Sequence, residues 1–244
     1  MAHSHSESAP MGGPGKLYGL GVGPGDPELL TLKATRILGQ VPVVFAAAST
    51  KNEHSLALSI VKSHLRPEAE VIRLGFPMTK DQELLRQAWL DNAAQVAAVL
   101  SQGLDAAFLT LGDPMIYSTF LYLERTLREL DPEVQVEVVP GVSSIQAAAA
   151  AAHQGLAESG QNLVVLSGVD DPERLRRGLA EADNAVILKP YRAFARIRDI
   201  LAEAGLSHRA VLVSRCGLEG QAVVRGLEDV SRNPPYFSLI LVKK

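Results

Sequence analysis

Two stretches of this 244-residue chain lead from an apolar run, through a turn rich in glycine, proline and aspartate, into a helical pattern. Residues 19–34 read GLGVGPGDPELLTLKA, and residues 109–118 read LTLGDPMIYS. In an open α/β sheet, turns of this kind lie at the carboxyl ends of strands, where ligands bind. The pattern therefore predicts an α/β fold with a ligand site built on both turns.

The first turn differs from the fingerprints of nucleotide-binding proteins. Its glycines alternate, and Pro24 stands where a G-x-G-x-x-G motif beginning at Gly19 requires its third glycine. The next apolar run ends in residues 47–49 (AAS), without the acidic residue that would hold a ribose. Gly15 and Lys16 are followed by leucine, so a P-loop is not predicted either. Binding of NAD or ATP is therefore disfavoured.

The length of 244 residues suits two medium-sized domains or one large one, and the composition fits an enzyme of a reducing compartment. Apolar residues make up 47% of the chain, which is enough for a substantial core, and the net charge of -3 provides no general attraction to nucleic acid. No apolar run is long enough to span a membrane. The single cysteine, Cys216, excludes an internal disulfide framework and a cysteine-based zinc site. We therefore expect a cytoplasmic protein that has neither nucleic acid nor a membrane as partner.

Apolar periodicity predicts that strands and helices alternate along most of the chain, after a disordered tail at residues 1–15. In the first half, strands are expected at 17–22, 41–46, 71–74, 106–111 and 134–139, with helices at 27–38, 55–65, 80–102, 116–130 and 143–153. In the second half, strands are expected at 163–167, 185–188 and 210–213, with helices at 171–181 and 194–203. No helix separates two last strands, at 221–225 and 237–242, which predicts neighbouring antiparallel strands at a sheet edge. The domain junction is placed near 118–132, which gives an N-terminal domain at 16–120 and a C-terminal domain at 121–244.

A third turn, residues 140–144 (PGVSS), follows the fifth predicted strand. The three turns, in this order and at this spacing, resemble those of the tetrapyrrole methylase family, which includes corrin-ring methyltransferases and diphthine synthases. The resemblance extends from Lys16 to the C-terminus. It implies two α/β domains with S-adenosylmethionine in a cleft between them, and a homodimer.

The resemblance also implies which residues bind the cofactor, and their chemistry partly supports the assignment. A carboxylate at Asp113 suits an ammonium group, and the helix start at Ser143 and Ser144 offers backbone amides to a carboxylate. One Gly-Asp-Pro turn alone is more typical of a type I turn with an N-cap, whereas three turns together favour a ligand. The implied cofactor-binding residues are Pro24, Leu111, Gly112, Asp113, Ile116, Ser143, Ser144, Lys189 and Tyr236.

Two segments favour one branch of the family. Residues 75–81 (GFPMTKD) and 113–119 (DPMIYST) most resemble the members that methylate C20 of precorrin-2, or of its cobalt form, in cobalamin synthesis. On this resemblance Lys80 and Tyr117 would bind the tetrapyrrole, and Phe76 with Met78 would pack on its face. A polycarboxylate substrate requires several cations. Candidates are Lys33, Arg36, Lys51, Arg73, Lys80, Lys189 and Arg192.

Other features leave alternatives open. Some relatives place an acidic residue at the end of the second strand, where this chain has Phe45-Ala46, so no catalytic base is assigned. The histidines show no metal-ligand spacing, and no resident metal is expected. Trp89 is expected to lie in the core. Methylation of another corrin position or of a diphthamide precursor, or a non-catalytic tetrapyrrole-binding module, are the alternative functions. The sequence does not decide whether the substrate already holds cobalt.

Overall fold

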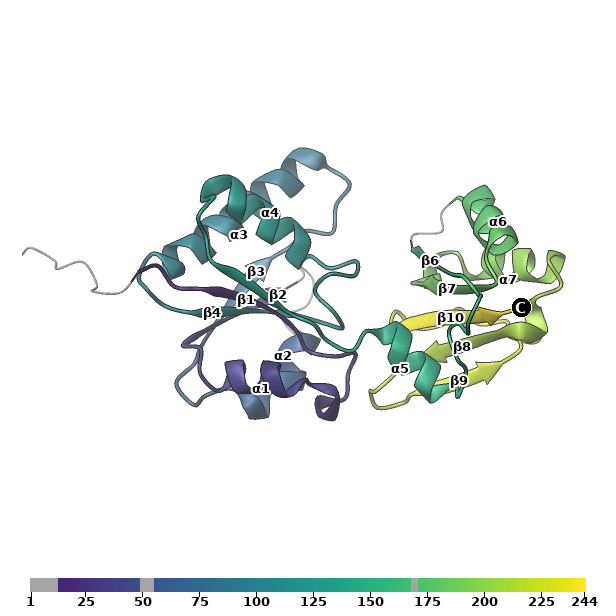
Figure 1. Cartoon of the computed structure of the whole chain (residues 1–244). Coiled ribbons are helices and arrows are strands. Elements are labelled where there is room, and N and C mark those ends of the chain that lie inside the picture. The colour runs from purple at the N-terminus through teal and green to yellow at the C-terminus, as the bar shows by residue number, and fades with distance from the viewer. Residues whose placement is uncertain (1–12, 49–54, 168–170) are drawn as a thin grey trace, which may run out of the picture. The chain divides into compact units, whose positions relative to one another are not determined.

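The structure, a computed structural model, describes residues 13–48, 55–167 and 171–244, and these form two units (Figure 1). Within the described residues, the first unit comprises residues 13–23 with Pro27–Val142, and the second comprises Pro24–Asp26 with Ser143–Lys244. Each unit has its own sheet and helices, so the α/β class expected from the sequence is confirmed. Most of the expected tail lies outside the described residues.

The first unit is built on a parallel sheet with the strand order β3-β2-β4-β1-β5. β1 pairs with β4 on one side and with β5 on the other, so the carboxyl ends of these three strands lie side by side. The strands are β1 (Leu17–Gly21), β2 (Val43–Ala48), β3 (Glu70–Gly75), β4 (Ala106–Thr110) and β5 (Val136–Val139).

Helices cover both faces of this sheet (Figure 1). Successive strand residues point to opposite faces. Leu20 and Leu109 therefore pack with α1 and α2, whereas Phe45 and Phe108 pack with α3 and α4. Burial on both faces explains why these strands read as continuous apolar runs. The helices are α1 (Leu32–Leu38), α2 (Leu56–Val61), α3 (Gln82–Leu100) and α4 (Phe120–Leu130), with short 3-10 helices η1 (Pro27–Leu29) and η2 (Lys62–His64).

The second unit is built on a mixed sheet with the strand order β6-β7-β10-β8-β9. β6 and β7 are parallel, β10 runs antiparallel to both β7 and β8, and β9 runs antiparallel to β8. The strands are β6 (Leu163–Ser167), β7 (Asn184–Leu188), β8 (Ala210–Ser214), β9 (Ala222–Arg225) and β10 (Ser238–Lys243).

Successive side chains of the strands again pack against helices on opposite faces of the sheet. Ile240 and Val242 of β10 pack with α6 and α7, and Leu239 and Leu241 pack with α5. The helices are α5 (Ser144–Ala151), α6 (Pro172–Glu181) and α7 (Phe194–Glu203), with 3-10 helices η3 (Pro190–Arg192) and η4 (Ser207–Arg209).

Three helices of the first unit differ from the sequence prediction. The helix expected over 55–65 consists of α2 followed by η2. The helix expected over 27–38 divides into η1 and α1, because the Thr31 hydroxyl accepts the Ala34 N–H at 3.2 Å and caps α1. The helix expected from residue 116 begins at Phe120. The Ser118 hydroxyl accepts the Phe120 N–H at 3.0 Å, and Tyr117 has a φ of 50°, which no right-handed helix can include.

The division between the units falls after Val142, later than the expected boundary at residue 120. β5 pairs with β1, which keeps both α4 and β5 within the first unit. Contrary to the sequence prediction, the two last strands are not antiparallel neighbours. β8 lies between β9 and β10, and since each is antiparallel to β8, they run parallel to each other. β10 occupies an interior position because both of its faces are apolar.

Candidate functional site

Three loops follow β1, β4 and β5, and glycine lets their backbones touch. The Gly112 N–H donates to the Gly23 carbonyl at 2.7 Å, and the Gly23 N–H donates back at 3.3 Å. A Cβ on Gly141 would lie 2.2 Å from the Gly112 oxygen and 2.7 Å from the Gly21 Cα. Only glycine fits so close an approach. The motifs around Gly21, Gly112 and Gly141 therefore meet at the carboxyl edge of the first sheet.

Asp113 ties two of these loops together. Its Oδ1 accepts the Met115 N–H at 2.8 Å, and its Oδ2 accepts the Gly141 N–H at 3.0 Å. Hydrogen bonds to an ionised carboxylate are stronger than neutral ones. This structural role is not predictable from the sequence alone, because it joins two segments that are far apart in the chain. Each oxygen retains acceptor capacity for a further donor.

The loop after Asp113 presents apolar side chains to solvent. Met115, Ile116 and Tyr117 are 52%, 42% and 53% exposed, and Tyr117 is in the left-handed region. Strained residues of this kind concentrate at ligand sites. Leu111, just before the turn, is half-buried and packs against the core under α1 and α2.

The β3–α3 loop divides its predicted substrate residues between core and surface. Lys80 is exposed beside Asp81, which caps α3, and Met78 is 64% exposed. Phe76 is buried instead, with its ring centroid 6.1 Å from that of Phe108 in an edge contact. The expectation that Phe76 packs on a ligand is therefore wrong, because this position faces the core under α3 and α4.

In the second unit, the start of α5 contains both predicted serines. Ser143 is buried, and its hydroxyl caps the helix by accepting the Ile145 N–H at 3.2 Å. Ser143 also contacts the Gln146 side chain. Ser144 is exposed as the first residue of the helix. Helix N-terminal amides favour an anion.

Lys189 and Tyr236 lie at the ends of two paired strands in the second unit. Lys189 follows β7, and Tyr236 precedes β10, which pairs with β7. The Tyr236 ring centroid is 5.2 Å from that of Tyr191 and 4.9 Å from that of Phe237. This aromatic cluster (Tyr191, Tyr236 and Phe237) was not predictable from the sequence, because only the strand order brings Tyr191 to the other two residues.

Pro24 is buried, and the residue after it contacts the loop that follows β8 in the same unit. A Cβ on Gly25 would lie 2.8 Å from the Gly217 oxygen and 2.7 Å from the Leu218 side chain. The alternating-glycine turn is thus close-packed at Gly25.

Not every candidate cation is available for a substrate. The Lys33 amine lies 2.6 Å from one oxygen of Glu137, and the Lys16 amine lies 3.3 Å from the other. These hydrogen bonds, first that from Lys33, hold the pKa of the Glu137 carboxyl below its usual range. Lys51 lies outside the described residues, whereas Arg36, Arg73 and Arg192 are exposed.

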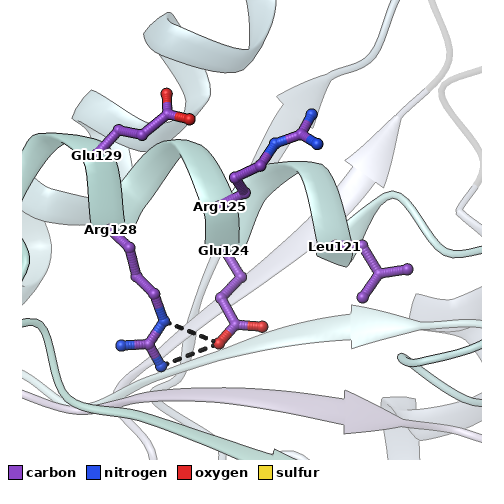
Figure 2. Close-up of a pocket in the computed structure, with 5 residues that line it drawn as sticks. All are labelled: Leu121, Glu124, Arg125, Arg128 and Glu129. Atoms are coloured by element: carbon purple, nitrogen blue, oxygen red, sulfur yellow. Dashed lines mark hydrogen bonds and ion pairs between the residues drawn. The ribbon is translucent and has the colours of Figure 1, made fainter.

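A surface hollow is lined by residues of α4. Figure 2 shows its lining residues, Leu121, Glu124, Arg125, Arg128 and Glu129. The Arg128 guanidinium donates to Glu124 Oε1 at 3.1 and 3.0 Å, and Arg125 and Glu129 extend from the other side of the helix. All five residues belong to one helix, and none is a predicted site residue.

Trp89 packs against the core as expected and stacks on Tyr122, with centroids 4.9 Å apart. In the part of the chain that the structure describes, no three side chains of His, Cys, Asp or Glu gather as metal ligands would.

Comparison with known proteins places this geometry in context. A profile of the family described as Tetrapyrrole (Corrin/Porphyrin) Methylases matches residues 16–230. The cobalt-precorrin-2 C(20)-methyltransferase of Salmonella typhimurium is 40% identical over 232 residues, which cover 94% of this chain and 97% of that protein. The precorrin-2 C(20)-methyltransferase of Sinorhizobium sp is 35% identical over 240 residues, covering 94% and 96%. The solved uroporphyrin-III C-methyl transferase of Thermus thermophilus, complexed with S-adenyl homocysteine, superposes with a TM-score of 0.64 at 30% identity and covers 93% of this chain and 97% of that one.

Proposed function

Since this chain belongs to the family of tetrapyrrole (corrin/porphyrin) methylases, we propose that it transfers a methyl group from S-adenosylmethionine to C20 of precorrin-2 or cobalt-precorrin-2. One observation supports the substrate above all others. The 40% identity to the Salmonella enzyme extends over nearly the full length of both chains. The same position is named for the Sinorhizobium protein, whose substrate name lacks cobalt. The choice between the two forms of the substrate is left to experiment.

The chemistry of the proposed cofactor-binding residues fits S-adenosylmethionine. In the first unit, the remaining acceptor capacity of Asp113 suits the ammonium group, and Leu111 and Ile116 offer apolar contact. In the second unit, the first turn of α5 suits the carboxylate, and the exposed Tyr236 ring suits the adenine. The related Thermus protein was solved with S-adenyl homocysteine, which supports this choice of cofactor. The complete proposed set is Pro24, Leu111, Gly112, Asp113, Ile116, Ser143, Ser144, Lys189 and Tyr236.

When bound, S-adenosylmethionine supplies a methyl group already activated on a positively charged sulfur. The residues of this chain then have to align the reacting carbon and exclude water, and alignment of this kind can lower a barrier by about 7–11 kcal/mol. Lys80 would hold a substrate carboxylate, and Tyr117, with its exposed neighbours Met115 and Ile116, would fix the ring. At the position in β2 where some relatives have an acidic residue, this chain has the buried Phe45, which cannot accept a proton. No residue is assigned as the base.

We also propose that the protein is a cytoplasmic homodimer. Exposed apolar side chains such as Leu32 and Leu84, which are 92% and 58% exposed, support burial against a second copy. None of the helices that the structure describes is long and apolar enough to cross a bilayer. Light scattering at micromolar concentration is expected to give about twice the chain mass, and a monomer over that range would contradict the dimer.

The test is anaerobic incubation of the purified protein with S-adenosylmethionine and one acceptor at a time. Formation of S-adenosylhomocysteine is the readout. We expect turnover with precorrin-2, with cobalt-precorrin-2, or with both, and the comparison decides the place of cobalt. Turnover with uroporphyrinogen III or a diphthamide precursor only would contradict the proposed substrate. Tetrapyrrole binding without turnover would favour the non-catalytic alternative.

A further inference from the structure

Two basic residues of the second unit share an unfavourable backbone conformation. Lys189 has a φ of 54° and Arg215 a φ of 53°, and they directly follow β7 and β8. Left-handed conformations are strained for residues with a side chain, and glycine would avoid this strain. Strain of this kind persists where the fold overrides it, and it concentrates at ligand clamps.

The strand order brings both residues to one edge of the sheet. β7 and β8 each run antiparallel to β10, so they are parallel to each other, and both end where β10 begins. Leu188 pairs with Leu239, and Ser214 pairs with Ser238. The Arg215 N–H donates to the Phe237 carbonyl at 2.7 Å. Lys189 and Arg215 therefore flank the first residues of β10.

The same edge carries the aromatic cluster defined above. Tyr236 and Phe237 immediately precede β10, and they are 49% and 41% exposed. Tyr191 belongs to η3, which starts directly after Lys189. The edge thus combines two cations with the exposed aromatic side chains of Tyr236 and Phe237, a combination that suits a flat ligand with carboxylates on its rim.

The Arg215 side chain is exposed at the end of β8. Neither Arg215 nor Lys189 forms an ion pair with any residue in the described ranges, unlike Arg176 and Arg198. The backbone around Arg215 is nevertheless held. Its carbonyl accepts the Leu218 N–H at 2.9 Å, and the Gln221 side chain accepts the Gly217 N–H at 2.8 Å. The arrangement is a fixed loop that carries an exposed cation, which has no ion-pair partner among the described residues.

We propose that Arg215 binds a carboxylate side chain of the tetrapyrrole and thereby determines the preference for a polycarboxylate substrate. This rests on the proposed function. The single carboxylate of the cofactor already has a proposed partner in the first turn of α5, whereas a ring with carboxylates along its rim needs several cations. A guanidinium matches a carboxylate with two parallel hydrogen bonds. Arg215 is thus a residue for substrate specificity.

Arg215→Gln tests the proposal, and Arg209→Gln is its matched control. Arg209 precedes β8 and Arg215 follows it, and both are exposed. We expect Arg215→Gln to raise the KM for precorrin-2 and the Kd for uroporphyrin, a stable polycarboxylate probe, by about tenfold. The Kd for S-adenosylhomocysteine is expected to stay unchanged. Arg215→Lys is expected to recover part of the affinity, and Arg209→Gln is expected to match the parent.

Arg215→Gly separates binding from folding. Since glycine relieves the left-handed strain, the Tm is expected to be no lower than that of the parent, although uroporphyrin binding is weakened. Unchanged tetrapyrrole affinity in Arg215→Gln, or a loss of S-adenosylhomocysteine affinity instead, would overturn the assignment. If the parent binds uroporphyrin through Arg215 but does not methylate precorrin-2, only the proposed function fails. If the parent neither binds uroporphyrin nor methylates precorrin-2, both fail.

Discussion

Gly141→Ala perturbs the point where the three loops of the first unit touch. The added Cβ would lie 2.2 Å from the Gly112 oxygen and 2.7 Å from the Gly21 Cα. Both are backbone atoms, so the loops must separate by about 1 Å to reach ordinary contact. Overpacking costs about 1–3 kcal/mol, and we expect the upper end because no flexible side chain can yield. The same movement strains the hydrogen bond from the Gly141 N–H to Asp113.

Thermal unfolding and calorimetry with S-adenosylhomocysteine measure the two expected consequences. A loss of about 3 kcal/mol corresponds to a Tm lower by roughly 6–12 °C in a chain of this size. The Kd is expected to rise in parallel, because the loops proposed to hold the cofactor have moved. Gly75→Ala is the matched control, since Gly75 ends β3 in the same sheet and a Cβ there meets nothing within 4 Å. If Gly141→Ala kept the Tm and affinity of Gly75→Ala, the reasoning about backbone contact would be refuted.

Three further substitutions or reactions test other parts of the structure. Asp113→Asn is expected to weaken S-adenosylhomocysteine binding by tenfold or more, since charge-assisted hydrogen bonds contribute about 1.5–3 kcal/mol. If the variant keeps full affinity while its Tm falls strongly, Asp113 is a purely structural residue. The lowered pKa of Glu137 means that its carboxylate stabilises the fold above its usual range near pH 4.5 and loses this effect as the pH falls through the lowered value. In Glu137→Gln the Tm should therefore decrease less on acidification than in the parent. If the Tm of the variant and of the parent depend on acidic pH in the same way, the contacts with Lys16 and Lys33 do not stabilise the fold. Burial raises the pKa of the Cys216 thiol, so at neutral pH iodoacetamide is expected to modify it more slowly than in the urea-unfolded chain; equal rates would contradict its partial burial.

Local patterns in the sequence predicted most elements of the fold. The strand–turn–helix stretches at 19–34 and 109–118 placed β1 and β4 correctly, and the third turn correctly located the start of α5. The predictions rested on periodicity and on turn residues, which act over a few positions. They failed where one hydrogen bond decided the boundary, as at the Ser118 hydroxyl that sets the start of α4.

Features that join distant segments were not predictable in the same way. The position of β10 between β7 and β8 depends on how the whole second sheet assembles. The aromatic cluster and the placement of Lys189 and Arg215 at one edge of the sheet follow from that order. Likewise, the Asp113 carboxylate accepts the Gly141 N–H across 28 positions. The residue type suggested an ammonium partner in a ligand, but it could not predict this backbone donor from a distant loop.

The position of a transferred carbon-13 methyl group tests the proposed function most directly. The protein is incubated anaerobically with methyl-labelled S-adenosylmethionine and precorrin-2 or its cobalt form, and the product is located by NMR. The proposed function predicts a single labelled methyl group on C20, the meso carbon between the first and last rings. A label at C11 or C17 would be consistent with a methyltransferase of this family but would contradict methylation at C20.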